Sequence, residues 1–275
     1  MMLPIMKVTI NNILSLIIQK LSIYIPFFNK IIYSLKNNHI FTQNDKFFKG
    51  LFFYGFSFFS SSPTSLEKEL LIKLNYSEQI IYDIGAYEGL FTTFFARRAK
   101  HVYAFEPNPI TFKMLLKNLI LNRLKNVNAY EVALGNVVDS MTLIMRTSNL
   151  ATSSLEEKIG NQIKREKGSI KAEVKVFPLD YLIKTYDLSP PDFIKIDVEG
   201  MEFNVLIGMK NIISEYKPRL FIEIHGADDI FKIKNIKNII SFLRHYNYKI
   251  YHLESSSEIS IENAEIAKIG RIYCF

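Results

Sequence analysis

Apolar and polar positions alternate along residues 63–245 in a way that predicts strands and helices in turn. Short apolar runs typical of buried strands fall near 80–84, 101–106, 127–133, 191–197 and 218–225. Segments with apolar residues at helical spacing fall near 89–99, 109–122, 201–214 and 229–245. Strands that alternate with helices form parallel sheets with helical crossovers. We therefore predict an α/β fold with a mostly parallel sheet flanked by helices.

The segment between the third and fourth strands is longer than one crossover helix. Residues 141–146 and 170–177 each alternate like strands, whereas 147–168 is polar and rich in Ser, Lys and Glu. We predict that 147–168 is a mobile flap near a pocket. At the end of the chain, 249–253 and 266–275 are typical of two closing strands, which we expect to form an antiparallel hairpin at the sheet edge.

The first 62 residues have a different pattern. Apolar residues recur at helical spacing from Ile10 to Leu21, Pro26 ends or kinks that element, and aromatic residues are dense from Phe47 to Phe59. A Ser-rich boundary precedes residues 64–67, Thr-Ser-Leu-Glu, which form a capping-box pattern at a helix start. We predict an apolar and basic N-terminal helical extension over 1–62 and a main domain over 63–275.

The net charge of +7 is concentrated in that extension. Residues 1–60 contain six Lys and one Asp, a balance of +5, which leaves +2 for the rest of the chain. This distribution does not indicate a nucleic-acid surface on the main domain. For the extension, two interpretations stay open, which are packing on the sheet and peripheral contact of residues 1–60 with an anionic membrane.

The apolar run from Val8 to Gln19 is too short to cross a bilayer, and no secretory signal is evident. The single Cys274 excludes a disulfide within the chain and favours a reducing compartment. We therefore expect a cytoplasmic protein, with attachment to the inner face of the membrane as an alternative.

A glycine turn follows the first strand of the main domain. Residues 83–89 read Asp-Ile-Gly-Ala-Tyr-Glu-Gly, and Glu106 ends the second strand. Glycine permits a tight turn and a close approach to a ligand, and an acid about 20 residues later can accept hydrogen bonds from ribose hydroxyls. With only Gly85 and Gly89, the turn lacks the full dinucleotide fingerprint. It favours a nucleoside with a positive charge and no phosphate, such as S-adenosylmethionine, over a nicotinamide cofactor.

Acids also follow the later strands. Asp197 and Glu199 come after the fourth strand, and Glu223 with His225 comes at the end of the fifth. The carboxyl ends of parallel strands meet at one edge of a sheet, so these side chains should converge on a cationic ligand. Since residues i and i+2 share a strand face, we expect Lys195 to meet Glu223 and Asp197 to meet His225. A structural role for the Lys195–Glu223 pair stays an alternative.

Two types of chemistry suit that group of residues. His225 or Asp197 is a candidate general base, with Glu199 and Glu223 orienting the base or the substrate. The same four side chains also offer three carboxylates and an imidazole to a divalent cation. Because the chain has neither a helical His-x-x-x-His pair nor a thiol cluster, we do not favour a required metal.

In their order along the chain, these motifs resemble those of the FkbM-type S-adenosylmethionine-dependent methyltransferases, a branch of the Rossmann-like class I methyltransferases. The likeness rests on residues 83–89, 104–109, 133–135, 194–202 and 221–223. It implies a seven-stranded sheet of order 3-2-1-4-5-7-6, with the cofactor over strands 1, 2 and 4. Residues 63–275 would then be the methyltransferase domain.

The resemblance also implies roles for single residues. Asp83, Gly85 and Gly89 would line the methionine part of the cofactor, Glu106 would bind the ribose, and Asp197 would face the amino group or the acceptor. The complete cofactor set is Asp83, Gly85, Ala86, Gly89, Glu106, Pro107, Asn108, Ala133 and Asp197. The family commonly has Asn where this chain has Tyr87, which puts in doubt a polar contact from that side chain but not the backbone turn.

The implied activity is methylation of a hydroxyl oxygen on a sugar, a glycan or a small molecule, without a nucleic-acid partner. A nucleic-acid methyltransferase is one alternative, although it would want a basic, aromatic-lined groove. Its usual Asn-Pro-Pro-Tyr type motif is also missing, because Pro190-Pro191-Asp192 stands before a strand. A non-catalytic, membrane-associated nucleoside-binding module is another, and the acids at the strand ends argue against it.

Overall fold

The computed structural model describes residues 40–41, 46–54, 63–146, 153–155, 157–164 and 169–275. The predicted apolar helix from Ile10 to Leu21 and part of the predicted flap at 147–168 lie outside these residues. Among the described helices, none combines the length and the hydropathy needed to span a bilayer.

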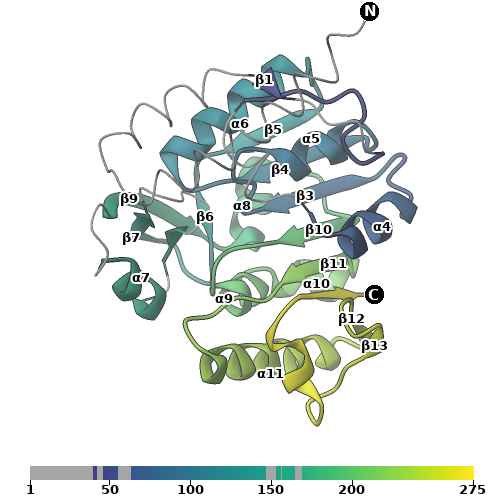
Figure 1. Cartoon of the computed structure of the whole chain (residues 1–275), viewed down its shortest axis with the longest axis vertical. Coiled ribbons are helices and arrows are strands. Elements are labelled where there is room, and N and C mark those ends of the chain that lie inside the picture. Colours follow the sequence, from purple (N-terminus) through teal and green to yellow (C-terminus); the bar gives the residue numbers. More distant parts are fainter. Residues whose placement is uncertain (1–39, 42–45, 55–62, 147–152, 156, 165–168) are drawn as a thin grey trace, which may run out of the picture.

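A central sheet of eight strands organises the described chain (Figure 1), in the order β13-β12-β14-β11-β10-β3-β4-β5. The five strands from β5 to β11 are parallel, and β14 is antiparallel to both of its neighbours. Apart from the short edge strand β13, this is the predicted order 3-2-1-4-5-7-6, so the predicted fold class is confirmed. The strands are β3 (Ile80–Ile84), β4 (His101–Phe105), β5 (Val127–Tyr130), β10 (Phe193–Ile196), β11 (Arg219–Glu223), β12 (Ile250–His252), β13 (Ser257–Glu258) and β14 (Arg271–Cys274).

The predicted antiparallel pairing of the two C-terminal strands near the sheet edge is confirmed, but one of the predicted boundaries was wrong. Strands β12 and β14 do pair antiparallel, but β14 lies between β11 and β12, and β13 forms the edge. Residues 266–268 belong to the 3-10 helix η1 (Ala264–Lys268) instead of a strand. The inner position of β14 places Arg271 beside β11, where it reaches the site.

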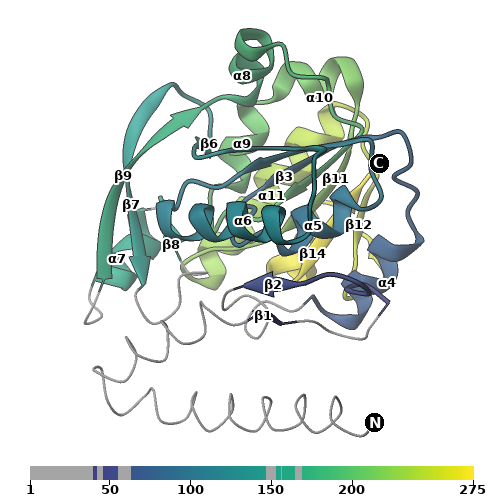
Figure 2. The ribbon, with the colours of Figure 1, turned by 90° about the horizontal axis from the view of Figure 1, so that it is seen from above.

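Helices cover both faces of the central sheet (Figure 2). One face packs against α4 (Ser65–Lys73), α5 (Leu90–Ala96) and α6 (Pro109–Leu121), and the other against α8 (Leu179–Tyr186), α9 (Glu202–Ile207), α10 (Lys210–Tyr216) and α11 (Asp229–His245). Strand β10 shows the alternation, since Phe193 packs with the α5 side whereas Ile194 and Ile196 pack on the opposite side. Lys195 shares the face of Phe193 and is buried, so its charge requires partners there.

The helix predicted over 201–214 is two helices, α9 and α10. The chain changes direction at Gly208, where a Cβ would lie 1.8 Å from the carbonyl oxygen of Gly135. This close approach to another loop requires glycine and interrupts the helix. The eight-residue helix α8 was not predicted from the sequence. Its start at Leu179 follows Pro178, whose backbone is extended.

A second sheet stands beside the carboxyl ends of the central strands (Figure 2). Its order is β6-β9-β7-β8, and its strands are β6 (Ala133–Leu134), β7 (Asp139–Arg146), β8 (Ser153–Ser154) and β9 (Ser169–Phe177). The predicted strands at 141–146 and 170–177 are confirmed as the antiparallel pair β7 and β9. The strand predicted over 127–133 is divided between the two sheets. Helix α7 (Glu157–Lys164) lies in the segment predicted as a flap.

The described part of the aromatic segment packs on the central sheet. Phe47, Phe48 and Phe53 are buried, and the ring of Phe47 stacks on Phe94 of α5 with centroids 3.8 Å apart. Strand β2 (Phe53–Tyr54) pairs with β1 (Ile40–Phe41), and Tyr54 N donates to Asn118 Oδ1 of α6 at 2.6 Å. These described residues therefore agree with the interpretation in which the extension packs on the sheet.

Candidate functional site

The turn after β3 holds the ends of three neighbouring strands together. Gly85 N and Ala86 N both donate to the Phe105 carbonyl at 3.0 Å. Gly85 has a φ of +77°, and a Cβ there would lie 1.8 Å from the carbonyl oxygen of Asp197. Only glycine satisfies both the left-handed conformation and this close contact. The turn therefore brings β3, β4 and β10 into one rim.

Glu106 is fixed at that rim by three donors. Its Oε2 accepts from Tyr87 N at 2.8 Å, and its Oε1 accepts from Asn108 N at 2.8 Å and from Thr111 Oγ1 at 2.9 Å. Burial raises the pKa of Glu106 to about 7, although these hydrogen bonds favour its ionised form. The carboxylate is thus oriented before any ligand arrives.

Tyr87 contributes to this arrangement through its backbone. Its φ of +52° is in the left-handed region, which Asn adopts more readily than other non-glycine residues. This conformation explains why Asn suits the position in the family that the sequence resembles. The backbone N–H of Tyr87 still reaches Glu106, so the turn itself tolerates the tyrosine.

A cavity of about 300 Å³ opens between the strand ends and the second sheet. It brings together nine residues that the sequence singled out, which are Gly85, Ala86, Glu106, Pro107, Ala133, Asp197, Glu199, Glu223 and His225. Apolar side chains including Phe91, Leu143 and Leu155 complete its wall. Glu106, which was predicted to bind the ribose, and the predicted bases His225 and Asp197 therefore line the same cavity.

Three predicted cofactor residues, Asp83, Gly89 and Asn108, lie behind the wall of the cavity. Asp83 is fully buried and accepts from Thr92 Oγ1 at 2.5 Å, and burial raises its pKa. Gly89 is the N-cap of α5 with a φ of +86°. Asn108 caps α6 through a 2.9 Å bond to Ile110 N, and its Nδ2 is buried without a hydrogen-bond partner among the described residues. These positions shape the cavity from behind.

Lys195 does not meet Glu223, so that prediction was wrong. The register of β10 and β11 places Lys195 opposite Phe221, two residues before Glu223. Its Nζ lies 3.1 Å from Asp197 Oδ2, 3.8 Å from Asp83 Oδ1 and 4.6 Å from the centre of the Phe91 ring. Burial lowers the pKa of Lys195, but the two carboxylates outweigh it and raise the pKa. The lysine is a buried cation that holds the carboxylate of Asp197 in place.

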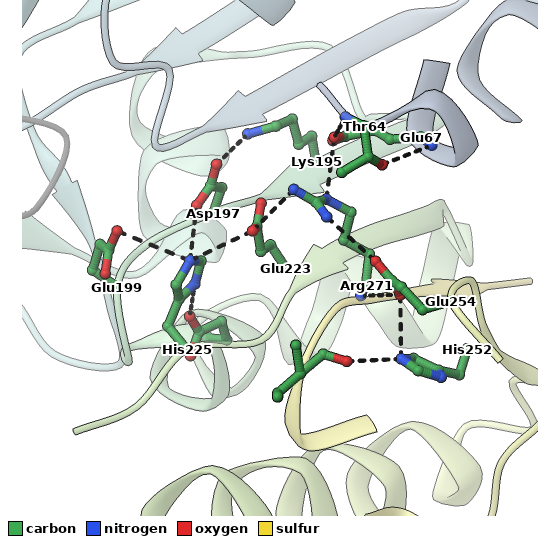
Figure 3. A network of polar contacts seen from close by, with 12 residues as sticks. Thr64, Glu67, Lys195, Asp197, Glu199, Glu223, His225, His252, Glu254 and Arg271 are labelled. Carbon is green, nitrogen blue, oxygen red and sulfur yellow. Dashed lines mark hydrogen bonds and ion pairs between the residues drawn. The ribbon is translucent and has the colours of Figure 1, made fainter. Parts of the chain in front are cut away.

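Asp197 meets His225, as predicted. Figure 3 shows His225 among three carboxylates: its Nε2 lies 3.7 Å from Asp197 Oδ1, 3.9 Å from Glu199 Oε1 and 3.9 Å from Glu223 Oε1. All three distances exceed that of a hydrogen bond. We call these four residues the acidic cluster. The polar atoms of the acidic cluster face one another at distances too long for hydrogen bonds.

Burial and neighbouring charges set the pKa values in the acidic cluster. Burial raises the pKa of Asp197, but Lys195 and His225 outweigh it and hold the pKa below its usual value. Burial raises the pKa of Glu199 to about 7, and it also raises that of Glu223. For His225, burial lowers the pKa, but the hydrogen bond to Glu202 and the nearby carboxylates raise it to about 10. The protein alone therefore favours an imidazolium at His225.

Glu202 orients His225 and was not identified from the sequence. Its Oε1 lies 3.1 Å from His225 Nδ1 and accepts from Gly200 N at 3.0 Å, while its Oε2 accepts from Asn235 Nδ2 at 2.8 Å. Glu202 is completely buried, so it directs Nε2 of the ring towards the acidic cluster. An acid in the first turn of a helix ordinarily complements the helix dipole, which hides this role in the sequence.

Arg271 was also missed, because its partners come from distant parts of the chain. It forms ion pairs with Glu67 of α4 at 3.2 Å, with Glu223 at 3.0 Å and with Glu254 at 3.3 Å (Figure 3). The carboxylate of Glu67 is 1% exposed, and burial raises its pKa to about 7 although Arg271 lowers it. Arg271 thus links the first helix of the main domain to the acidic cluster.

Comparison with known proteins indicates the family of the chain. A family model, the methyltransferase FkbM domain, matches residues 83–250. "Methyltransferase 1" of Beauveria bassiana is 29% identical over an alignment that covers 56% of this chain and 72% of that protein. "Hexuronic acid methyltransferase AglP" of Haloferax volcanii is 26% identical, with 58% of this chain and 62% of that protein covered.

Among solved structures, the methyltransferase FkbM of Methylobacillus flagellatus KT is similar at 20% identity with a TM-score of 0.47. That match covers 74% of this chain and 45% of the solved chain, so this chain spans less than half of it. The family match includes the glycine turn, Glu106 and all four residues of the acidic cluster. The chain therefore belongs to the FkbM methyltransferase family.

Proposed function

We propose that the protein transfers a methyl group from S-adenosylmethionine to a hydroxyl oxygen of a sugar, a glycan or another small molecule. The observation that carries this proposal is that one cavity is lined both by the turn at Gly85 with Glu106 and by the acidic cluster. A nucleoside cofactor and an acceptor hydroxyl can thus occupy one enclosed space, where positioning lowers the barrier to reaction.

The residues present fit the cofactor. Gly85 and Ala86 line the cavity at the turn, where Gly85 can lie against the Asp197 carbonyl because it has no Cβ. Oε2 of Glu106 accepts one hydrogen bond from Tyr87 and keeps a lone pair for a ribose hydroxyl. Gly85 and Ala86 would hold the methionine part, and Glu106 and Pro107 the adenosine. S-adenosylmethionine supplies, when bound, a methyl group on a positively charged sulfur that is already activated.

The acidic cluster would receive the acceptor. An alcohol must lose its proton as its oxygen attacks, which requires a base within hydrogen-bond reach. His225 Nε2 and Asp197 Oδ1 are the atoms that we propose for this role, with Glu199 and Glu223 orienting the acceptor through its other hydroxyls. Positive charge brought into the cavity shifts His225 towards the neutral form that can take a proton.

A sugar is the acceptor class that we favour. Carboxylates accept hydrogen bonds from hydroxyls, and several of them line the cavity, as recognition of a polyol requires. The relative from Haloferax volcanii is named as a methyltransferase of hexuronic acid, which supports a sugar substrate. Two apolar residues, Leu143 of β7 and Leu155 just after β8, would contact the carbon side of the ring.

The test is an assay of the full chain with methyl-labelled S-adenosylmethionine. Neutral sugars, hexuronic acids and simple phenols serve as separate acceptor panels, and the readouts are the labelled product and the demethylated cofactor. We expect label in a sugar hydroxyl with wild type and its loss in Asp197→Asn. Label found only in phenols would contradict the sugar acceptor. Absence of cofactor binding would contradict the whole proposal.

A further inference from the structure

We infer that Asp197, Glu223 and His225 form a binding site for a divalent cation at the acceptor side of the cavity. One ligand atom from each of the three lies within 4.8 Å of the others. The sequence did not favour a required metal, and it is the spatial arrangement that changes this assessment. The inference deepens the proposed function by assigning the group that receives the acceptor, but cation binding itself does not need the cofactor.

The spacing in the acidic cluster suits an ion. His225 Nε2 lies 3.7 Å from Asp197 Oδ1 and 3.9 Å from Glu223 Oε1, which is too far for hydrogen bonds. Ligand atoms bound to one divalent ion at about 2.0–2.6 Å lie roughly 3–5 Å from one another. Glu199 Oε1, 3.9 Å from the same nitrogen, is near enough to bind directly or through water. The gap between these atoms has the size that a cation fills.

Each proposed ligand is held by another residue, and for Asp197 and His225 the contact is to the atom that does not face the cluster. Lys195 Nζ is 3.1 Å from Asp197 Oδ2, Arg271 is 3.0 Å from Glu223 Oε1, and Glu202 Oε1 is 3.1 Å from His225 Nδ1. A carboxylate on the far nitrogen of a histidine is the usual support of a metal-binding imidazole, because it fixes the ring and its tautomer. These contacts leave Asp197 Oδ1 and His225 Nε2 directed at the same point.

The charge around the cavity supplies an independent reason. Its wall contains the carboxylates of Glu67, Glu106, Asp197, Glu199 and Glu223, against two permanent cations, Lys195 and Arg271, and the imidazolium favoured at His225. Oε1 of Glu67 is buried on this wall and has no hydrogen-bond partner among the described residues. Buried carboxylates without matching cations are costly, and a bound cation removes that cost.

The ligand types indicate which ions would bind. Carboxylates, the majority of the ligands, suit Mg²⁺ and Mn²⁺, and we choose Mn²⁺ as the probe. No thiol lies in the site, since Cys274 is buried in β14. In the proposed reaction, the ion would polarise the acceptor hydroxyl, and its proton would pass to the carboxylate of Glu199, which is not among the three ligands. His225 would then act as a ligand, because its Nε2 cannot bind a cation and accept a proton at once.

The experiment is a titration of the full chain with Mn²⁺, followed by electron paramagnetic resonance without cofactor. We expect one bound Mn²⁺ per chain, displaced by Mg²⁺, and at least tenfold weaker binding in Asp197→Asn, Glu223→Gln and His225→Asn. Glu202→Gln should weaken binding by about 10–100-fold through the supporting contact. Glu265→Gln, on an exposed acid of η1 away from the cavity, is the matched control and should bind like wild type.

Circular dichroism and a thermal melt show which variants fold. If one of the three ligand variants does not fold, the other two still test the site. Wild type that binds no Mn²⁺, or binds it no better than the folded ligand variants, overturns the cation site. A parallel titration with S-adenosylmethionine separates the two proposals. Cofactor binding without Mn²⁺ binding rejects only the cation site, and Mn²⁺ binding without cofactor binding rejects only the proposed function.

Discussion

Glu202 Oε1 lies 3.1 Å from His225 Nδ1, and Glu202 is completely buried whereas His225 faces the cavity. A buried carboxylate in this position fixes the ring and leaves Nε2 as the atom that faces the acidic cluster. His225 is therefore placed for a role at the acceptor, and it lines the same cavity as Glu106 and the glycine turn that we assign to the cofactor.

Replacing His225 should separate turnover from cofactor binding. We expect His225→Ala to lower turnover about 100-fold or more, the size of a lost base or ligand in the transition state. The dissociation constant for S-adenosylmethionine should change far less, because Gly85 and Glu106 are untouched. Steady-state kinetics with calorimetric titration measures both quantities. Unchanged turnover would remove His225 from the mechanism.

Glu106 should make cofactor affinity depend on pH. Burial raises its pKa to about 7, so in the free protein the carboxylate gains a proton as the pH falls through that value. The ionised form is the one that accepts hydrogen bonds from both ribose hydroxyls. We therefore expect affinity for the demethylated cofactor to fall between pH 8 and pH 6.

Glu106→Gln is the matched variant for that prediction. It preserves shape but removes the charge, and it should bind the demethylated cofactor roughly tenfold or more weakly at pH 8, the equivalent of about 1.5 kcal/mol or more for a charged hydrogen bond. Its affinity should also lose most of the dependence on pH. Calorimetric titrations of both proteins at the two pH values provide the comparison, and an equal slope in both would refute the role of Glu106.

Gly85 should tolerate no side chain. Gly85→Ala places a Cβ 1.8 Å from the Asp197 carbonyl in a left-handed conformation with a φ of +77°. Gly50→Ala is the control, because Gly50 has a similar φ of +75° but faces only the flexible end of Arg97 at 3.3 Å. We expect a loss of about 1–2 kcal/mol from the left-handed strain in Gly50→Ala and a clearly larger one in Gly85→Ala. Urea denaturation measures the difference, and equal losses would mean that the contact with Asp197 can relax.

Arg271 and Glu67 should be coupled in stability. Arg271→Met leaves buried carboxylates without their partner and should cost roughly 3 kcal/mol or more. Combining it with Glu67→Gln should cost less than the sum of the two single changes by about 1–3 kcal/mol, because the double variant no longer buries the Glu67 charge. Denaturation at pH 8, above the pKa of about 7 for Glu67, keeps that carboxylate ionised in wild type. Additive losses would show that the ion pair does not stabilise the fold.

The parallel strands and the shared rim could be predicted because each depends on local signals, whereas the strand order was implied by the resemblance to the FkbM-type methyltransferases. Apolar runs define the five parallel strands, and the residues that follow them, Gly85, Glu106, Asp197 and Glu223, must meet once those strands are neighbours. The pairing of Asp197 with His225 followed from the same argument. The Lys195–Glu223 pair was wrong because strand register depends on packing that the sequence pattern does not fix. The register places Phe221 of β11 opposite Lys195 on one side and Asp83 of β3 opposite it on the other.

Other parts of the site depend on contacts between distant segments. Glu67 reaches Arg271 across about three quarters of the chain, and β14 must insert beside β11 before Arg271 can contact Glu223. The pattern of apolar residues along the chain does not indicate such an insertion. Similarly, Glu202 is typical of an ordinary acid in the first turn of a helix. Only the fold shows that it is buried and that it contacts Asn235 of α11. The sequence thus indicates which residues carry the chemistry, whereas packing determines which residues hold them.

The most direct test of the central claim is calorimetric titration of the full chain with S-adenosylmethionine, alongside the folded Glu106→Gln and Gly85→Ala variants. We predict one binding site per wild-type chain, weaker binding in Glu106→Gln and loss of binding in Gly85→Ala. A folded wild-type protein that shows no affinity for S-adenosylmethionine or its demethylated product would contradict the account.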